Sequence, residues 1–250
     1  MTRIEKDFLG EKELPDDAYY GVQTLRGKEN FHITGIPMST EPYFVKAFGY
    51  VKKAAALANR DLGVLDATVA NAIAAACDRL IAGEMADQFV TDFIQGGAGT
   101  STNMNANEVI ANLALEQLGH QKGEYQYVNP NDHVNFGQST NDVYPTAFRL
   151  ALILRLGSYM DALRRLQEAF FAKAREFDRV LKMGRTHLQD AVPMSLGQEF
   201  HGWGTTIGEE VQRIAEVRQF LHEINLGATA IGTTVTAAPG YPELATKYLS

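Results

Sequence analysis

Residues 144–177, YPTAFRLALILRLGSYMDALRRLQEAFFAKAREF, decide the fold of this 250-residue chain. Pro145 suits the first turn of a helix, and no further proline follows until Pro193. A helix over these residues would be about 50 Å long at 1.5 Å per residue. The large apolar side chains step by four and three along one heptad seam: Leu152, Leu156, Tyr159, Leu163, Leu166 and Phe170. This spacing predicts a helix whose seam is buried against other helices of a bundle.

The rest of the chain is also predicted to be mainly α-helical, with at most a few short strands near the N-terminus. Strand–helix alternation and a G-x-G-x-x-G turn are both missing from the sequence, which argues against a dinucleotide fold. We expect a smaller, mostly helical domain over residues 1–138 and the first part of a central helical bundle over residues 139–250. Apolar spacing and capping residues place further helices at about 43–59, 66–80, 84–95, 104–118 and 195–224.

Composition and charge exclude several classes of function. The net charge of −7 argues against partners such as nucleic acid or an anionic membrane. No apolar run reaches membrane-spanning length, and the charged N-terminus has no signal-peptide core, so we expect a cytoplasmic protein. The lone cysteine, Cys77, lies in an alanine-rich helical stretch and is expected to be a buried, inert thiol. No Cys/His cluster has zinc spacing, so we predict neither a metal site nor a cofactor.

Three polar segments are the strongest functional signal in the sequence. Residues 99–103 (GTSTN), 137–142 (GQSTND) and 184–190 (GRTHLQD) each gather hydroxyls and amides next to a glycine and lead toward an apolar helical pattern. Such residues are preferred as N-caps, which is the structural alternative for any one segment. Uncharged donors at a helix start also suit a small carboxylate, because backbone N–H groups and the helix dipole point the same way. Three segments together therefore favour a site for a small di-acid.

The same segments carry a resemblance to the aspartase/fumarase superfamily. The matching stretches are residues 15–24 (PDDAYYGVQT), 99–110 (GTSTNMNANEVI), 129–135 (NPNDHVN) and 184–187 (GRTH), which occur in the order typical of the family. The resemblance implies a mainly α fold, a homotetramer with a central helical bundle, and active sites that each draw segments from three subunits. It also implies an anti elimination on a small dicarboxylate, L-aspartate or fumarate, through an aci-carboxylate intermediate.

Site roles follow from this resemblance residue by residue. Thr100, Ser139 and Thr140 match positions that hold the β-carboxylate of the substrate, and Asn141 matches the position beside its amino group. Thr186 and His187 match the pair near the α-carboxylate and the amine. His187 is a possible catalytic residue, because imidazole can relay a proton near neutral pH. Substrate binding is the role we favour for it.

Two departures from the family pattern bear on activity. Members of the family are nearly twice as long, and their base is a serine in a Gly-Ser-Ser-x-Met-Pro-Gly-Lys loop that we expect beyond Ser250. The chain therefore resembles the N-terminal portion only, and we expect it to be inactive alone. Residues 232–236 (GTTVT) also differ, since Thr234 and Thr236 stand where the family has a glycine and an asparagine.

Three functions remain open at this stage. The segment Ser139-Thr140-Asn141 followed by DVYPTA favours the ammonia-lyase members, which eliminate ammonia from L-aspartate to give fumarate. A class II fumarase, which hydrates fumarate to malate, is the alternative within the family. A truncated module that only assembles is the alternative outside catalysis.

Overall fold

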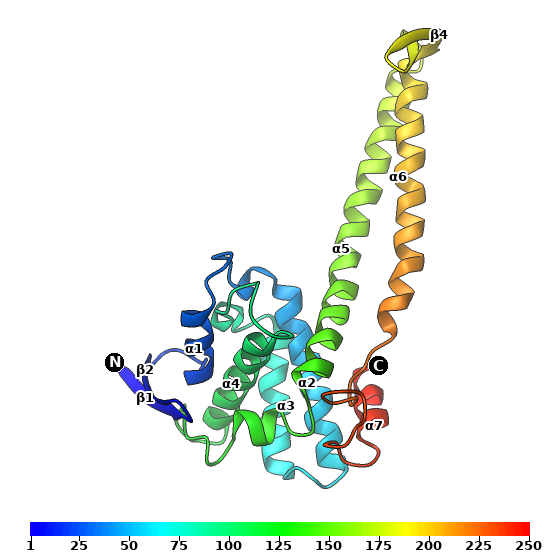
Figure 1. Cartoon of the computed structure of the whole chain (residues 1–250). Helices are drawn as coiled ribbons and strands as arrows, with labels where there is room; N and C mark the ends of the chain where they lie inside the picture. The colour runs from blue at the N-terminus through cyan, green and yellow to red at the C-terminus, as the bar shows by residue number, and fades with distance from the viewer. The chain divides into compact units, whose positions relative to one another are not determined.

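The computed structural model describes residues 1–250, and most of its elements are α-helices (Figure 1). The prediction of a mainly α fold is confirmed. The chain forms two compact units, one of Met1–Leu152 with Ile224–Ser250 and the other of Ile153–Glu223. We describe each unit by itself. The predicted domains at residues 1–138 and 139–250 stay a prediction.

The first unit contains five helices and one small sheet. Strand β1 (Thr2–Asp7) pairs antiparallel with β2 (Gly10–Pro15). The helices are α1 (Val22–Asn30), α2 (Pro42–Asp61), α3 (Ala67–Ala82), α4 (Thr100–Gln117) and α7 (Tyr241–Leu249), together with the start of α5 (Thr140–Glu176). Short 3-10 turns at Met38–Thr40 and Ala86–Gln88 and a π-helical turn at Pro130–Val134 connect them.

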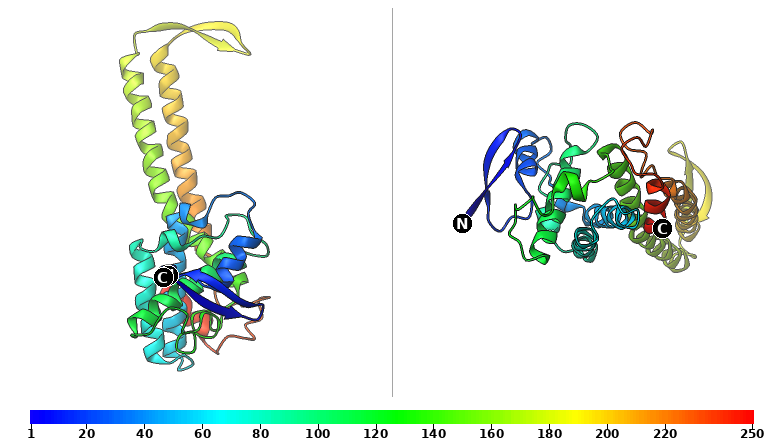
Figure 2. Two further views of the ribbon diagram at one scale, coloured as in Figure 1. Left: turned by 90° about the vertical axis from the view of Figure 1, so that its left-hand side faces the viewer. Right: turned by 90° about the horizontal axis from the view of Figure 1, so that it is seen from below.

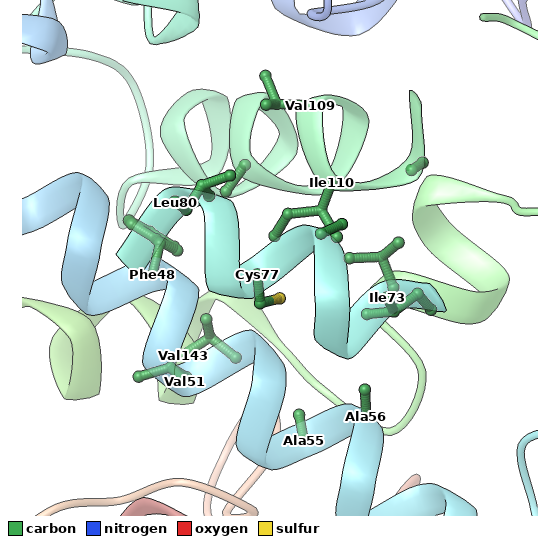
Figure 3. Packing of buried hydrophobic residues seen from close by; sticks show 14 of the residues in the cluster. Phe48, Val51, Ala55, Ala56, Ile73, Cys77, Leu80, Val109, Ile110 and Val143 are labelled. Atoms are coloured by element: carbon green, nitrogen blue, oxygen red, sulfur yellow. The ribbon is translucent and has the colours of Figure 1, made fainter. Parts of the chain in front are cut away.

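The core of this unit lies between α2, α3 and α4. Buried alanines of α2 and α3 belong to this core, and larger side chains such as Phe48 and Ile110 pack with them (Figure 3). Cys77 is fully buried among these side chains, and burial raises the pKa of its thiol. The prediction of a buried, unreactive thiol at Cys77 is consistent with this environment.

Two of the matching sequence stretches meet in this unit through one buried carboxylate. Glu108 of α4 accepts hydrogen bonds from the backbone N–H groups of Gly21 (2.9 Å), Gln23 (2.9 Å) and Thr24 (3.0 Å) at the start of α1. Gly21 is required there, because a Cβ at this position would lie 2.8 Å from Cδ of Glu108. Residues 15–24 and 99–110 are thus linked for a structural reason, with α1 anchored by its N-terminal N–H groups.

The second unit is a helical hairpin with a strand pair at its turn. The part of α5 from Ile153 onward and α6 (Leu196–Arg218) lie side by side, and β3 (Leu181–Thr186) and β4 (Gln189–Ser195) join them (Figures 1 and 2). Ser195 begins α6 with a capping box, since its hydroxyl accepts from the N–H of Gln198 and the Gln198 side chain accepts in return.

The long helix is confirmed, but the expected burial of its seam is wrong for a single chain. Helix α5 has 37 residues and is the longest element. It begins at Thr140, so Pro145 lies inside the helix rather than at its first position. On the seam, Tyr159 is 50% and Leu166 is 43% exposed, because α6 covers only one side of α5 in this unit.

Two further expectations are corrected. Residues 84–95 do not form an α-helix and contain only the 3-10 turn Ala86–Gln88, because Gly83 and Met85 both adopt the left-handed conformation. The carboxylate of Asp92 then ties the following loop to the backbone N–H groups of Thr34 and Gly35. Strands occur at residues 181–195 as well as near the N-terminus. None of the helices combines the length and the apolar character that a membrane span needs.

Candidate active site

A cleft of about 630 Å³ lies between the loop that precedes α4 and the first turns of α5. Asn141, one of the predicted site residues, lines it, and Thr100 directly follows its lining residue Gly99. The other lining residues are Phe93, Ile94, Gln95, Gly97, Ala98, Tyr144 and Pro145. Two of the three polar segments predicted from the sequence therefore border one cleft within the first unit.

Gly99 brings the starts of α4 and α5 together. Its φ is +93°, and a Cβ at this position would lie 2.2 Å from the Tyr144 ring of α5. That ring packs edge-on against Phe44 of α2 at a centroid distance of 5.2 Å and is therefore held in place. Only glycine meets both demands, so this residue fixes the position of Thr100 as the first residue of α4.

The second segment forms a capped helix start at α5. The Ser139 hydroxyl accepts from the N–H of Asn141 (3.2 Å), and the Asp142 carboxylate accepts from the N–H of Ser139 (3.0 Å). This resembles a capping box with aspartate in place of glutamate, although the Ser139 hydroxyl accepts from the second rather than the third N–H group of the helix. The capping role that we weighed for this segment is therefore present at Ser139. The Ser139 hydroxyl keeps its own proton to donate, so capping and anion binding are compatible.

The loop that contains the departures from the family pattern is tied to this helix start. The buried carboxylate of Asp142 accepts from the N–H groups of Gly227 (3.1 Å) and Thr229 (3.0 Å). The side chain of Asn141 donates to the carbonyl of Ala230 at 2.9 Å. Farther along the loop, Thr234 has a φ of +59°, so it adopts a left-handed conformation where the family pattern has glycine.

Behind Thr140 lies a buried polar network that the sequence analysis missed. Lys52 of α2 is fully buried and donates to the side-chain oxygens of Asn135 (2.8 Å) and Gln138 (2.9 Å). Asn103 of α4 donates to Asn135 (3.2 Å) and to the hydroxyl of Thr140 (3.1 Å). The signal was present in the sequence, because Lys52 continues the buried stripe of α2 at the spacing of Val45, Phe48, Ala55 and Asn59.

The buried amine of Lys52 predicts a specific pH dependence of stability. Burial lowers its pKa from 10.5 to about 7, and the nearby carboxylate of Asp142 only partly opposes this. In the unfolded chain the pKa returns to the ordinary value, so the unfolded state binds more protons than the folded state between these two values. The free energy of unfolding should therefore rise with pH from about 7 toward 10.

Urea unfolding at a series of pH values tests this expectation. Lys52→Met should flatten the rise relative to wild type, whereas Lys53→Met should keep it, because Lys53 is partly exposed and paired with Asp78. Equal slopes in wild type and Lys52→Met would contradict the assignment.

The third polar segment does not start a helix, which corrects the sequence-based expectation. Thr186 ends β3, and His187 and Leu188 form the two-residue turn before β4, with φ values of +48° and +63°. Two positive φ values are typical of a type I′ hairpin turn, for which Asn-Gly is the usual sequence. Thr186 and His187 are exposed at this turn, and Arg185 pairs with Asp190 at 3.0 Å.

The predicted site residues thus fall into two groups. Thr100, Ser139, Thr140 and Asn141 belong to the first compact unit, and Thr186 and His187 belong to the second. Within the first group, the structure brings the starts of α4 and α5 to one cleft. No member of either group is assigned a substrate contact by the structure, so their roles stay predictions.

Comparison with known proteins identifies the family. A family model described as lyase matches residues 10–250. The chain belongs to this lyase family. It is 58% identical over all 250 residues to an aspartate ammonia-lyase of Pseudomonas aeruginosa and 56% identical over 249 residues to that of Escherichia coli K12. The lyase chain covers 53% and 52% of these two relatives, so it spans about half the length of the curated relatives that it matches.

Solved structures of other proteins share the fold of this chain. A fumarate lyase:delta crystallin from Brucella melitensis, bound to cobalt, superposes with a TM-score of 0.96 at 55% identity. A class II fumarase from Schistosoma mansoni superposes with a TM-score of 0.90 at 35% identity. Each match covers the whole of this chain and 54% or 52% of the solved chain. The resemblance to the N-terminal portion of aspartase/fumarase superfamily members is therefore confirmed.

Proposed function

We propose that the protein containing these residues eliminates ammonia from L-aspartate to give fumarate. The observation that carries the proposal is the cleft where the starts of α4 and α5 meet, which Asn141 lines, with Thr100 and Thr140 as the first residues of the two helices. The 58% identity to an aspartate ammonia-lyase supports the choice of substrate. Neither a metal nor a cofactor is part of the proposal.

The chemistry explains why donors rather than a cation suit this cleft. A base removes the proton from Cβ, and the electron pair moves into the adjacent β-carboxylate to give an aci-carboxylate. Ammonia then leaves from Cα as the double bond forms. Thr100, Ser139 and Thr140 would donate to the β-carboxylate, where negative charge increases during the reaction, and Asn141 would lie beside the amine. Such donors accelerate the reaction only if they bind the transition state more tightly than the substrate.

We further propose that the site is completed by other copies of the chain in a homotetramer. Thr186 and His187 lie in a different compact unit from the cleft, which is compatible with their serving a neighbouring subunit's site. The half-exposed seam of α5, including Tyr159 and Leu166, would pack into the shared bundle. The resemblance also implies a base serine that none of these residues matches. The 250 residues by themselves are therefore proposed to be inactive, and His187 is proposed to bind substrate.

Fumarate hydration is the second candidate, because a class II fumarase shares 35% identity and this fold. The sequence of residues 139–145 at the start of α5, STNDVYP, favours ammonia elimination over fumarate hydration. An assembling module without catalysis is the remaining alternative.

Initial rates with two substrates separate these functions. We expect the whole protein to form fumarate from L-aspartate with release of ammonia in equal amount, and to convert L-malate at a much lower kcat/KM. A higher kcat/KM for malate would establish the fumarase alternative. A folded, assembled whole protein that converts neither substrate would support the non-catalytic module.

A further inference from the structure

The donor and acceptor roles in the buried network are fixed from one end, by Lys52. A charged lysine Nζ is a donor and never an acceptor, and a neutral Nζ still carries two N–H groups that donate. The side-chain oxygens of Asn135 and Gln138, at 2.8 and 2.9 Å from Nζ, therefore act as acceptors. One of them is Oδ1 of Asn135, whose Nδ2 donates to the carbonyl of Gln138 at 3.2 Å. The amide of Asn135 is thus oriented by two partners, with its oxygen facing Asn103.

This orientation in turn fixes the amide of Asn103. The Asn103 atom that faces Oδ1 of Asn135 at 3.2 Å must be a donor, and it is Nδ2. The opposite orientation would place two acceptor oxygens against each other. Asn103 keeps this orientation although its own Oδ1 is buried without a hydrogen-bond partner and the residue is 1% exposed. A buried unpaired oxygen is unfavourable, so the contacts of Nδ2 outweigh it.

The second hydrogen of Asn103 Nδ2 determines whether the Thr140 hydroxyl acts as a donor or as an acceptor toward Asn103. Nδ2 lies 3.1 Å from Oγ1 of Thr140, so that oxygen accepts. A hydroxyl that accepts from one side has its single proton free for another acceptor. Thr140 is partly exposed at the first position of α5, where N-terminal N–H groups favour an anion.

We propose that Lys52, Asn135 and Asn103 are positioning residues that orient the Thr140 hydroxyl as a hydrogen-bond donor toward a carboxylate of the substrate. The inference rests on the proposed function for the identity of that carboxylate. It assigns no contact with substrate to the three residues, because they act through Thr140. The network therefore selects for an acceptor, such as a carboxylate oxygen, and against a donor, such as a neutral amide N–H, at the first residue of α5.

A double-mutant cycle in the whole protein tests the inference through binding of succinate, a dicarboxylate that cannot eliminate ammonia. Asn103→Leu should raise the Kd of succinate about tenfold or more, the effect of one lost hydrogen bond to a charged group. In a Thr140→Val background the same replacement should change the Kd less than about threefold, because the hydroxyl that it orients is gone. A residue with a merely structural role would weaken binding equally in both backgrounds.

Lys52→Met provides a second arm of the test if Asn103→Leu does not fold. It should raise the Kd of succinate about threefold or more in the wild-type background, and should have no such effect in the Thr140→Val background. The control Lys53→Met should bind succinate like wild type. Equal losses in both backgrounds, or wild type that binds no succinate, would overturn the inference. Wild type that binds succinate with the predicted coupling but does not deaminate aspartate would contradict the proposed function alone.

Discussion

In the whole protein, Thr140→Ala should lower kcat/KM for L-aspartate about a hundredfold, and kcat should fall with it. In the proposed mechanism the hydroxyl would donate most strongly when the β-carboxylate gains charge, so its loss would raise the free energy of the transition state more than that of the bound substrate. One such donor is typically worth about 3 kcal/mol of transition-state stabilisation. Thr100→Ala should act in the same direction, because Thr100 is the first residue of α4 and directly follows Gly99, which lines the cleft.

Thr40→Ala is the matched control for this experiment. Its hydroxyl is exposed and donates to the Pro37 carbonyl outside the cleft. It should leave both kinetic constants within about twofold of wild type, because surface changes of this kind have small effects. A Thr140→Ala enzyme with a raised KM but an unchanged kcat would show that Thr140 binds substrate and transition state equally, and would contradict the proposed role.

Gly99→Ala should have the largest effect on stability, lowering the free energy of unfolding by about 3 kcal/mol. Two costs combine at this position, a left-handed φ of +93° and a Cβ that would lie 2.2 Å from the Tyr144 ring. Because Tyr144 packs against Phe44 and Phe48, the ring cannot move without disturbing the core. Activity should fall too, since the shift separates the starts of α4 and α5.

Gly63→Ala separates the two costs in the same unfolding experiment. Gly63 also has a positive φ, +71°, but a Cβ there would meet no atom within 4 Å. It should lose about 1 kcal/mol, the cost of the left-handed conformation alone. If Gly99→Ala were no more destabilising than Gly63→Ala, the close approach of Gly99 to Tyr144 would not be a determinant of the site.

Structural features that depend only on neighbouring residues, such as a helix cap or a single helix, were predictable from the sequence. Asp66 was expected to cap a helix, and its carboxylate accepts from the N–H groups of Thr68 and Val69 at the start of α3. The long helix around residues 144–177 was predictable from its heptad spacing alone. The burial of its seam was not, because that property depends on what packs against the helix rather than on the helix itself.

The missed features depend on tertiary context. The β3–β4 hairpin has no one-sided apolar alternation, since Leu181, Met183 and Val192 are all exposed, and its turn is His-Leu instead of a glycine-containing pair. The hydrogen bonds that link α2, α4 and the start of α5 in the polar network behind Thr140 join residues 32 to 86 positions apart, which no local pattern reports. Within the candidate site, the two helices were therefore predictable with starts at about residues 104 and 144, four residues after the observed starts at Thr100 and Thr140. The groups that orient these starts were not predictable.

The central claim of this account is that Thr100, Ser139, Thr140 and Asn141 bind one end of a dicarboxylate. A crystal structure of the whole protein with succinate tests it most directly. We expect one carboxylate in the cleft, with hydroxyls of Thr100 and Thr140 within about 3 Å of its oxygens. Thr186 and His187 from another copy of the chain should lie near the other carboxylate. Succinate bound elsewhere, or in the cleft without contact to Thr140, would contradict the account.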